Sequence, residues 1–137
     1  MRLLLPLLLT ACTTPMPDTP TLSLAGSEWG PTDTATFGPD TFLQFREDTL
    51  SASAGCNQLS ATYTLDGARL ALSPIRSTRM MCPPPVMAHE TALTTALQST
   101  RSAHTSRDGA NDGARTELVL HDDTGTPILR LRRRDWD

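Results

Sequence analysis

The sequence predicts a single α+β domain, because several short β-type runs come first, one helical run follows, and two further strands close the chain. Its 137 residues suffice for one domain with a hydrophobic core. Apolar residues make up 38% of the chain and aromatic residues only 4%, so we expect a small core. The 12 basic residues are all Arg and face 15 acidic residues. The resulting net charge of -3 disfavours nucleic acid as a partner.

The first residues form a pattern typical of an export signal. Arg2 precedes the apolar run 3–9, which is much shorter than the roughly 20 residues of a membrane-spanning helix. The run ends in Leu9-Thr10-Ala11-Cys12, which resembles the lipobox of bacterial lipoproteins. This resemblance implies that 1–11 is a signal peptide and that Cys12 becomes the lipidated mature N-terminus, which anchors the protein to a membrane. The alternative is an ordinary secretory signal in which Cys12 has no role.

A Pro- and Thr-rich segment separates Cys12 from the rest of the chain. Residues 12–25 are too rich in Pro and Thr for a helix or sheet interior, so we interpret them as a tether. An extended tether at about 3.1 Å per residue would reach some 35 to 40 Å. Thr13 follows the lipobox Cys where an inner-membrane retention signal would have Asp, so we expect an outer-membrane anchor facing the periplasm. The folded domain is expected to span 26–134.

Two hairpins are predicted in the first half of the domain. The runs 41–45 and 49–52 are rich in β-forming residues and are divided by charged ones. The runs 60–65 and 68–72 flank Asp66-Gly67, a pair typical of a type I′ turn. Side chains in the first of these runs alternate, so we expect Ala61, Tyr63 and Leu65 on one face.

The second half is predicted to hold one helix and two strands. The helix is expected from Val86 to about Thr100, with Val86, Leu93 and Leu97 on one stripe. The strands are expected at 117–121 and 127–132. Residues 104–115, between the helix and the first of these strands, are polar and rich in turn formers, which is typical of a long loop.

Three stretches in a fixed order point to a known family. They are Gly55-Cys56-Asn57, the hairpin around Tyr63, and Thr78-Arg79-Met80-Met81-Cys82-Pro83 ahead of the helix. Together they resemble the META/HslJ-like domain over about 27–132. This resemblance implies a strongly curved, mostly antiparallel sheet packed on one helix. It also implies a secreted or lipid-anchored protein, in a family that includes heat-inducible lipoproteins linked to novobiocin resistance. No catalytic residue and no cofactor come with the family.

The other two cysteines form an even pair. With Cys12 lipidated, Cys56 and Cys82 would meet an oxidising compartment, which favours a disulfide. A loop of this length would stabilise the fold by roughly 3 to 4 kcal/mol on the chain-entropy model. A reactive redox pair is the less favoured alternative, since the spacing is not C-x-x-C, and buried free thiols are the third.

Sulfur and nitrogen donors gather near Cys82. Met80, Met81, Met87 and His89 lie close to it in the sequence, and such soft donors select Cu(I). A copper site is therefore an alternative hypothesis. The competing interpretation is that the methionines belong to the family motif and pack in the core.

Two further histidines and a basic run complete the candidate sites. His104 and His121 fall in or beside predicted loops and lack a triad pattern, so we expect plain surface residues. Arg130 and Arg132 share one face of the last predicted strand. Three interpretations are open: the arginines are simply solvated, they protect a sheet edge, or they contact lipid headgroups. Arg79 is a further tentative contact residue.

These features predict a non-enzymatic envelope lipoprotein. We expect it to support envelope integrity under stress by binding a protein or lipid partner. The alternatives are a copper-binding lipoprotein and, less favoured, a thiol-dependent enzyme, for which we find no polarised nucleophile.

Overall fold

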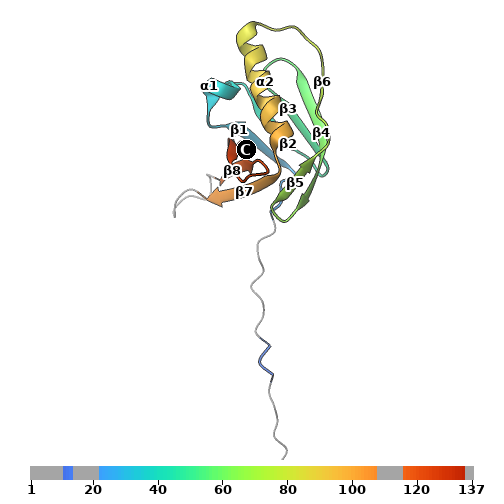
Figure 1. Cartoon of the computed structure of the whole chain (residues 1–137), viewed down its shortest axis with the longest axis vertical. Helices are drawn as coiled ribbons and strands as arrows, with labels where there is room; N and C mark the ends of the chain where they lie inside the picture. The colour runs from blue at the N-terminus through green and yellow to red at the C-terminus, as the bar shows by residue number, and fades with distance from the viewer. Residues whose placement is uncertain (1–10, 14–21, 108–115, 135–137) are drawn as a thin grey trace, which may run out of the picture.

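The computed structural model describes residues 11–13, 22–107 and 116–134, and these ranges fold into nine strands and two helices (Figure 1). The α+β class with a mostly antiparallel sheet is confirmed, with a short helix added to the expected one. In chain order the elements are β1 Ser27–Pro31, α1 Thr34–Phe37, β2 Phe42–Phe45, β3 Thr49–Ser53, β4 Gln58–Asp66, β5 Arg69–Leu72, β6 Arg76–Ser77, α2 Pro84–Ser99, β7 Ser102–Arg107, β8 Thr116–His121 and β9 Pro127–Arg133.

The strands form one sheet in the order β3-β2-β1-β9-β8-β7-β5-β4-β6. The sheet is closed, because β3 at one end of this order also pairs with β4 near the other end. The strand pairs in the described ranges are all antiparallel. The first and last strands, β1 and β9, meet in the middle of this order. Because β9 has a strand on each side, its arginines do not protect a sheet edge, and that interpretation of Arg130 and Arg132 is wrong.

Both predicted hairpins are present, but the turn of the second differs from the prediction. Asp66 pairs with Arg69, so the two loop residues are Gly67 and Ala68. Gly67 has a φ of 58°, and no non-glycine residue in the described ranges has a positive φ. A glycine at the first loop position, followed by a residue with negative φ, fits type II′ rather than type I′. The loop therefore lies one residue further along the chain than predicted, and each partner across the hairpin changes by two residues.

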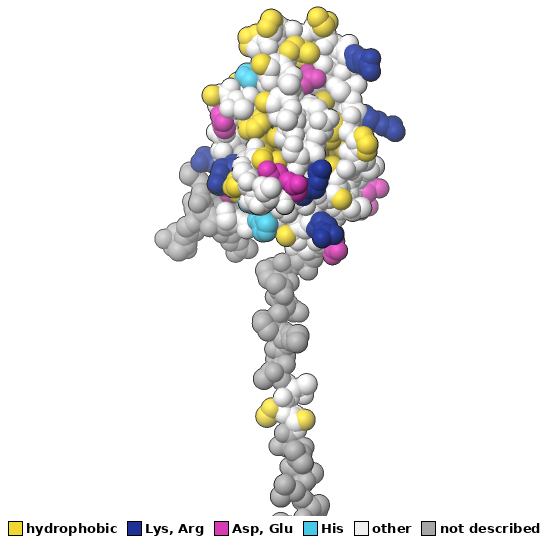
Figure 2. Space-filling view, viewed as in Figure 1, with side chains coloured by type: hydrophobic (Ala, Val, Ile, Leu, Met, Phe, Trp, Pro, Cys, Tyr) yellow, Lys and Arg dark blue, Asp and Glu magenta, His cyan; other side chains and the backbone are white. Residues whose placement is uncertain are grey.

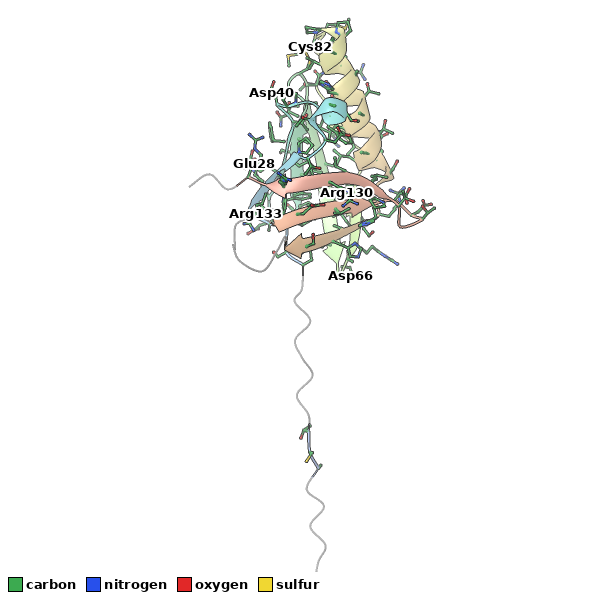
Figure 3. All side chains as sticks on the ribbon, turned by 90° about the vertical axis from the view of Figure 1, so that its left-hand side faces the viewer. Glu28, Asp40, Asp66, Cys82, Arg130 and Arg133 are labelled. Atoms are coloured by element: carbon green, nitrogen blue, oxygen red, sulfur yellow. A yellow bond between two sulfur atoms is a disulfide. The ribbon has the colours of Figure 1, made fainter. Side chains whose placement is uncertain are left out.

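The core lies between the inner faces of the strands and helix α2, which runs along one side of the sheet (Figures 1 and 3). Leu93 and Leu97 of α2 are fully buried as predicted, whereas Val86 is only half-buried at the start of the helix. Phe45 and Tyr63 pack edge to face at 5.2 Å between ring centroids. Leu24 is also buried, although the sequence placed it in the tether. Apolar side chains of the domain therefore begin to pack ahead of Gly26.

Three strands were absent from the sequence prediction, namely β1, β7 and the two-residue β6. Strand β1 carries buried Trp29 and joins β2 to β9. Strand β7 includes residues 104–107, which were expected in a loop. The side chains of residues 104–106 are polar and exposed while Ala103 is buried, so β7 shows little of the apolar alternation that identifies a strand.

The predictions for the two ends and the long loop are only partly covered by the described ranges. Residues 1–10, most of the tether, 108–115 and Trp136 lie outside them. Within the described ranges, the helices are too short or too polar to cross a membrane.

Candidate functional site

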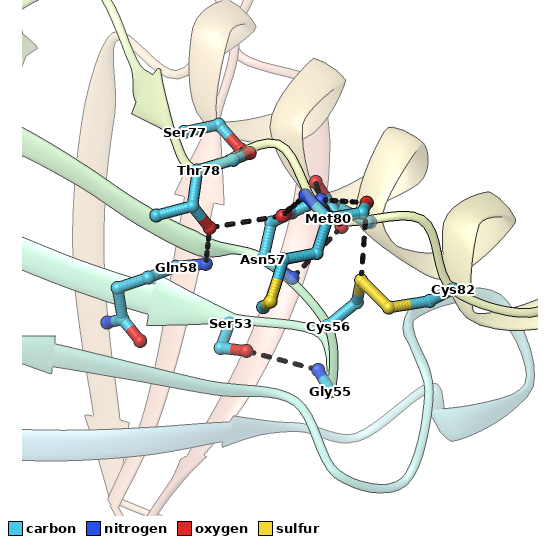
Figure 4. The surroundings of a disulfide bond; sticks show 10 residues. Ser53, Gly55, Cys56, Asn57, Gln58, Ser77, Thr78, Met80 and Cys82 are labelled. Atoms are coloured by element: carbon cyan, nitrogen blue, oxygen red, sulfur yellow. Dashed lines mark hydrogen bonds between the residues drawn. A yellow bond between two sulfur atoms is a disulfide. The ribbon is translucent and has the colours of Figure 1, made fainter.

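The expected disulfide between Cys56 and Cys82 is present, with the two Cα atoms 6.1 Å apart (Figure 4). It joins the bend after β3 to the residues that precede α2, across a separation of 26 residues. Gly55 precedes the first cysteine with a φ of +96°, a conformation that side-chain-bearing residues rarely adopt. The backbone therefore makes a tight turn at Gly55, next to the disulfide.

Asn57 holds the loop before α2 by its side-chain amide. It is 3% exposed. Its Oδ1 accepts hydrogen bonds from the hydroxyl of Thr78 at 3.0 Å and the backbone N–H of Met80 at 2.6 Å. Its Nδ2 donates to the Met80 carbonyl oxygen at 3.2 Å. One buried side chain thus satisfies both backbone groups of Met80.

Glu90 of α2 completes this arrangement from the other side. Its carboxylate accepts hydrogen bonds from Asn57 Nδ2 at 3.0 and 3.1 Å, and from the Asn57 backbone N–H at 3.3 Å. Glu90 was not predicted as a site residue. A signal was present, because Glu90 lies three and seven residues before the buried Leu93 and Leu97, on the stripe that faces the core. We call Asn57, Glu90, Thr78 and the Met80 backbone the Asn57 clamp.

The methionines of the motif point away from the core. Met80 is 54% exposed and Met81 is 94% exposed, so the expectation that they pack in the core is wrong. The backbone N–H and C=O of Met80 face the buried Asn57 side chain, and the side chains of Met80 and Met81 are exposed. Figure 2 shows hydrophobic atoms gathered at the end of the domain where α2 begins. Exposed Arg79 lies beside Met80, Met81 and Met87 on a hollow of about 440 Å³. We call these four residues the Met tip.

The proposed copper ligands do not converge. Cys82 has no thiolate to offer, because it is part of the disulfide. His89 is absent from the lining of the hollow at the Met tip. Its ring instead lies against Gly38, where a Cβ would come within 2.7 Å of the imidazole Nδ1. Of the proposed copper ligands, only Met80, Met81 and Met87 line a common hollow.

The basic strand and the two remaining histidines lie on another face, formed by β7, β8 and β9. Arg130 and Arg132 are exposed there as predicted, and the Arg130 guanidinium forms an ion pair with Glu117 at 3.0 Å. His104 and His121 lie on β7 and β8 rather than in loops. Their Nδ1 atoms are 3.3 Å apart. His104 is exposed and His121 is half-buried, so both lie at the surface as expected, but they lie on strands and their rings form a contacting pair.

Comparisons with known proteins give a family and a fold. The model of the META domain matches residues 23–135. The NMR structure of a protein from Burkholderia xenovorans superimposes with a TM-score of 0.64 at 19% identity, covering 90% of this chain and 99% of that one. At this identity the likeness shows the fold alone. A search of the curated proteins found no match.

Proposed function

The chain belongs to the META domain family, and on this premise we propose that it is a non-enzymatic envelope lipoprotein that binds a protein partner through the Met tip. The observation that carries the proposal is the exposure of Met80 and Met81 on a loop whose backbone is fixed. Exposed apolar groups favour association. A fixed backbone lowers the entropy lost on binding.

The disulfide supports an envelope location. Disulfides form and persist in oxidising compartments such as the periplasm and are rare in the bacterial cytosol. Cys12 is exposed and lies outside the disulfide, so its thiol is available for lipidation. We place the anchor in the outer membrane, facing the periplasm, on the basis of the lipobox resemblance and Thr13.

The position of the Met tip favours a protein partner over the anchoring membrane. Leu22 and Leu24 lie with Leu65 near the end of β4, whereas Thr78 hydrogen-bonds to Gln58 at its start. The nine residues of β4 span roughly 25 to 30 Å. Cys82 and Asp66 accordingly lie at opposite ends of the domain (Figure 3). A chain anchored ahead of Leu22 would present the Met tip away from its membrane.

Several observations favour binding over chemistry. Cys56 and Cys82 share a disulfide, which leaves the domain without a nucleophilic thiol. A hollow of about 660 Å³ beside β5 is lined by Ser73, but that hydroxyl bonds backbone groups of Thr62 and Pro74 rather than a base. The META domain is also not known as an enzyme family. An accessory role in envelope stress agrees with these features.

A crosslinking experiment tests the Met tip. A photoreactive residue would replace Met81 in the lipidated protein in intact cells, and a matched one would replace exposed Thr95 on α2. We expect a discrete protein adduct from position 81 only, which Met80→Ser weakens. Equal adducts from both positions, or none from position 81, would contradict the proposal.

Lipid headgroups are the second candidate partner, favoured by exposed Arg130 and Arg132 on one face of β9. Vesicles with anionic lipid would separate the two candidates. Binding that falls with Arg132→Glu and is unaffected by Met81→Ser would favour headgroups. If the protein does not bind these vesicles, the protein partner is favoured over lipid headgroups.

A further inference from the structure

His104 and His121 form a pair that neither the family nor the proposed function explains. They come from neighbouring strands, where the register pairs His104 with Val119 and His121 with Ser102. Their rings are perpendicular, with centroids 4.9 Å apart, and the two Nδ1 atoms face one another at 3.3 Å. His104 is exposed and His121 is half-buried, so the pair is open to solutes.

We propose that His104 and His121 bind a zinc ion through their Nδ1 atoms. Zinc binds imidazole nitrogen at about 2.0 to 2.1 Å in tetrahedral geometry, which requires two nitrogen ligands to lie about 3.3 to 3.4 Å apart. The observed separation is 3.3 Å. A square-planar ion with similar bond lengths would require about 2.8 to 3.0 Å. The spacing of the two nitrogens therefore matches that of two ligands of a tetrahedral ion.

The surroundings of the pair suit a bound cation. Val119 and Pro127 supply apolar side chains to the same hollow of about 310 Å³. Arg130 also lines it, but its guanidinium is bonded to Glu117. The positive charge in the lining of this hollow is thus paired with a carboxylate.

The number of ligands predicts an open, exchangeable site. In the described ranges no group of three or more His, Cys, Asp or Glu side chains is placed to hold a metal. Two of the four tetrahedral positions would then be filled by water or by a donor from another molecule. Such a site would add a metal-dependent contact on the β7–β9 face, which is separate from the Met tip.

The metal competes with a hydrogen bond between the two rings. In the metal-free pair one Nδ1–H donates to the other Nδ1. Zinc needs both Nδ1 lone pairs, so both rings must carry their proton on Nε2. Metal binding therefore has a signature at specific atoms, because both Nδ1 resonances should move together.

Zinc titration of the untagged full-length chain tests the site. We expect one equivalent of Zn²⁺ by calorimetry, a rise in the thermal midpoint, and paired ¹⁵N shifts of both Nδ1 atoms. His104→Gln and His121→Gln should each weaken binding at least about tenfold, the smallest loss typical even for an outer-shell partner of a metal ligand. The control is His89→Gln, which removes the third histidine and should leave binding unchanged.

Three results would overturn the zinc site. The first is no binding by the wild-type chain at millimolar Zn²⁺. The second is binding that survives both His104→Gln and His121→Gln. The third is dependence on one of the two histidines alone, which would indicate a single-ligand contact rather than the pair. Circular dichroism of each variant excludes unfolding as the cause of a loss.

Discussion

The Asn57 clamp and the outer face of β7–β9 are stabilised in different ways. The clamp is held by a disulfide and by hydrogen bonds to the buried side chains of Asn57 and Glu90. The outer face is held by strand pairing, and its polar groups, such as Arg130 and His104, stand exposed. Figure 3 shows the two regions apart, with Cys82 at one end of the domain and Arg130 on the strands below.

This difference separates structural from functional effects of mutation. Side chains of the clamp fix the backbone, so changing them should lower stability and disturb the Met tip together. Side chains of the β7–β9 face rest on a backbone that pairs without them, so changing them should alter binding at small cost in stability.

Loss of the disulfide should have the largest effect. Cys56→Ser should lower the free energy of unfolding by about 3 to 4 kcal/mol, because the unfolded chain loses a cross-link that spans 26 residues. Urea denaturation under oxidising conditions measures the change. The double variant Cys56→Ser with Cys82→Ser should be destabilised to a similar extent, since either substitution breaks the same bond. Two reactive thiols in the unreduced wild-type domain would contradict this prediction.

Removal of the Asn57 amide should have the next largest effect. Asn57→Ala would remove the side-chain partner of both Met80 backbone groups and the side-chain hydrogen bonds to Glu90, whose carboxylate would keep only the backbone N–H of residue 57, and should cost about 1 to 3 kcal/mol. Denaturation of the oxidised protein measures the loss. Amide exchange at Met80 should also accelerate, while amides of β8 keep their protection.

A double-mutant cycle with Glu90→Gln provides the control. Since the two side chains bond directly, the effects of Asn57→Ala and Glu90→Gln should deviate from additivity by about 0.5 kcal/mol or more. Additive effects would mean that the two residues act independently and would refute the clamp as a unit.

The sequence predicted the first region better than the second because its signals are local. Gly55, Cys56 and Asn57 are consecutive, and the parity of cysteines indicated the disulfide without knowledge of the fold. The exposure of Met80 could not be predicted in this way. It depends on which backbone groups Asn57 binds, and apolar character alone favours burial.

The β7–β9 face depends on contacts between distant segments. His104 and His121 are 17 residues apart and meet only through the register of β7 and β8. The outward side chains of β7 are polar, so that strand resembles a loop in the sequence. The central position of β9 likewise follows from its pairing with β1, where Pro31 lies opposite Leu131.

Breaking the ion pair on the outer face should have a small effect. Arg130→Ala removes the bond to Glu117, but the arginine side chain is 56% exposed, so water and salt screen the pair. The expected cost is below about 1 kcal/mol. Urea denaturation at low and high salt should show the difference shrinking as salt rises. Arg132→Ala is the matched control on the same face, and a cost above that of Asn57→Ala would break the contrast between the regions.

The turn that connects β8 to β9 should show the smallest effect, visible mainly as a pH dependence. Hydrogen bonds from the Thr124 side chain and the Thr126 backbone, together with the charge of His121, hold the pKa of Asp122 below its ordinary value near 3.8. A carboxylate with a lowered pKa in the folded state contributes stability above its unfolded pKa, and this contribution is lost as the pH falls through the folded value. The Thr126 amide resonance should therefore titrate with a midpoint below 3.8.

Asp122→Asn keeps an acceptor oxygen without the charge and should abolish that titration. His121→Gln should move the midpoint upward, since it removes one of the causes that lower the pKa. Amides of the Asn57 clamp should be unchanged by either variant. A midpoint above 3.8 in the wild-type protein would show that the turn does not favour the charged carboxylate, and that the electrostatics of this face differ from those inferred from its geometry.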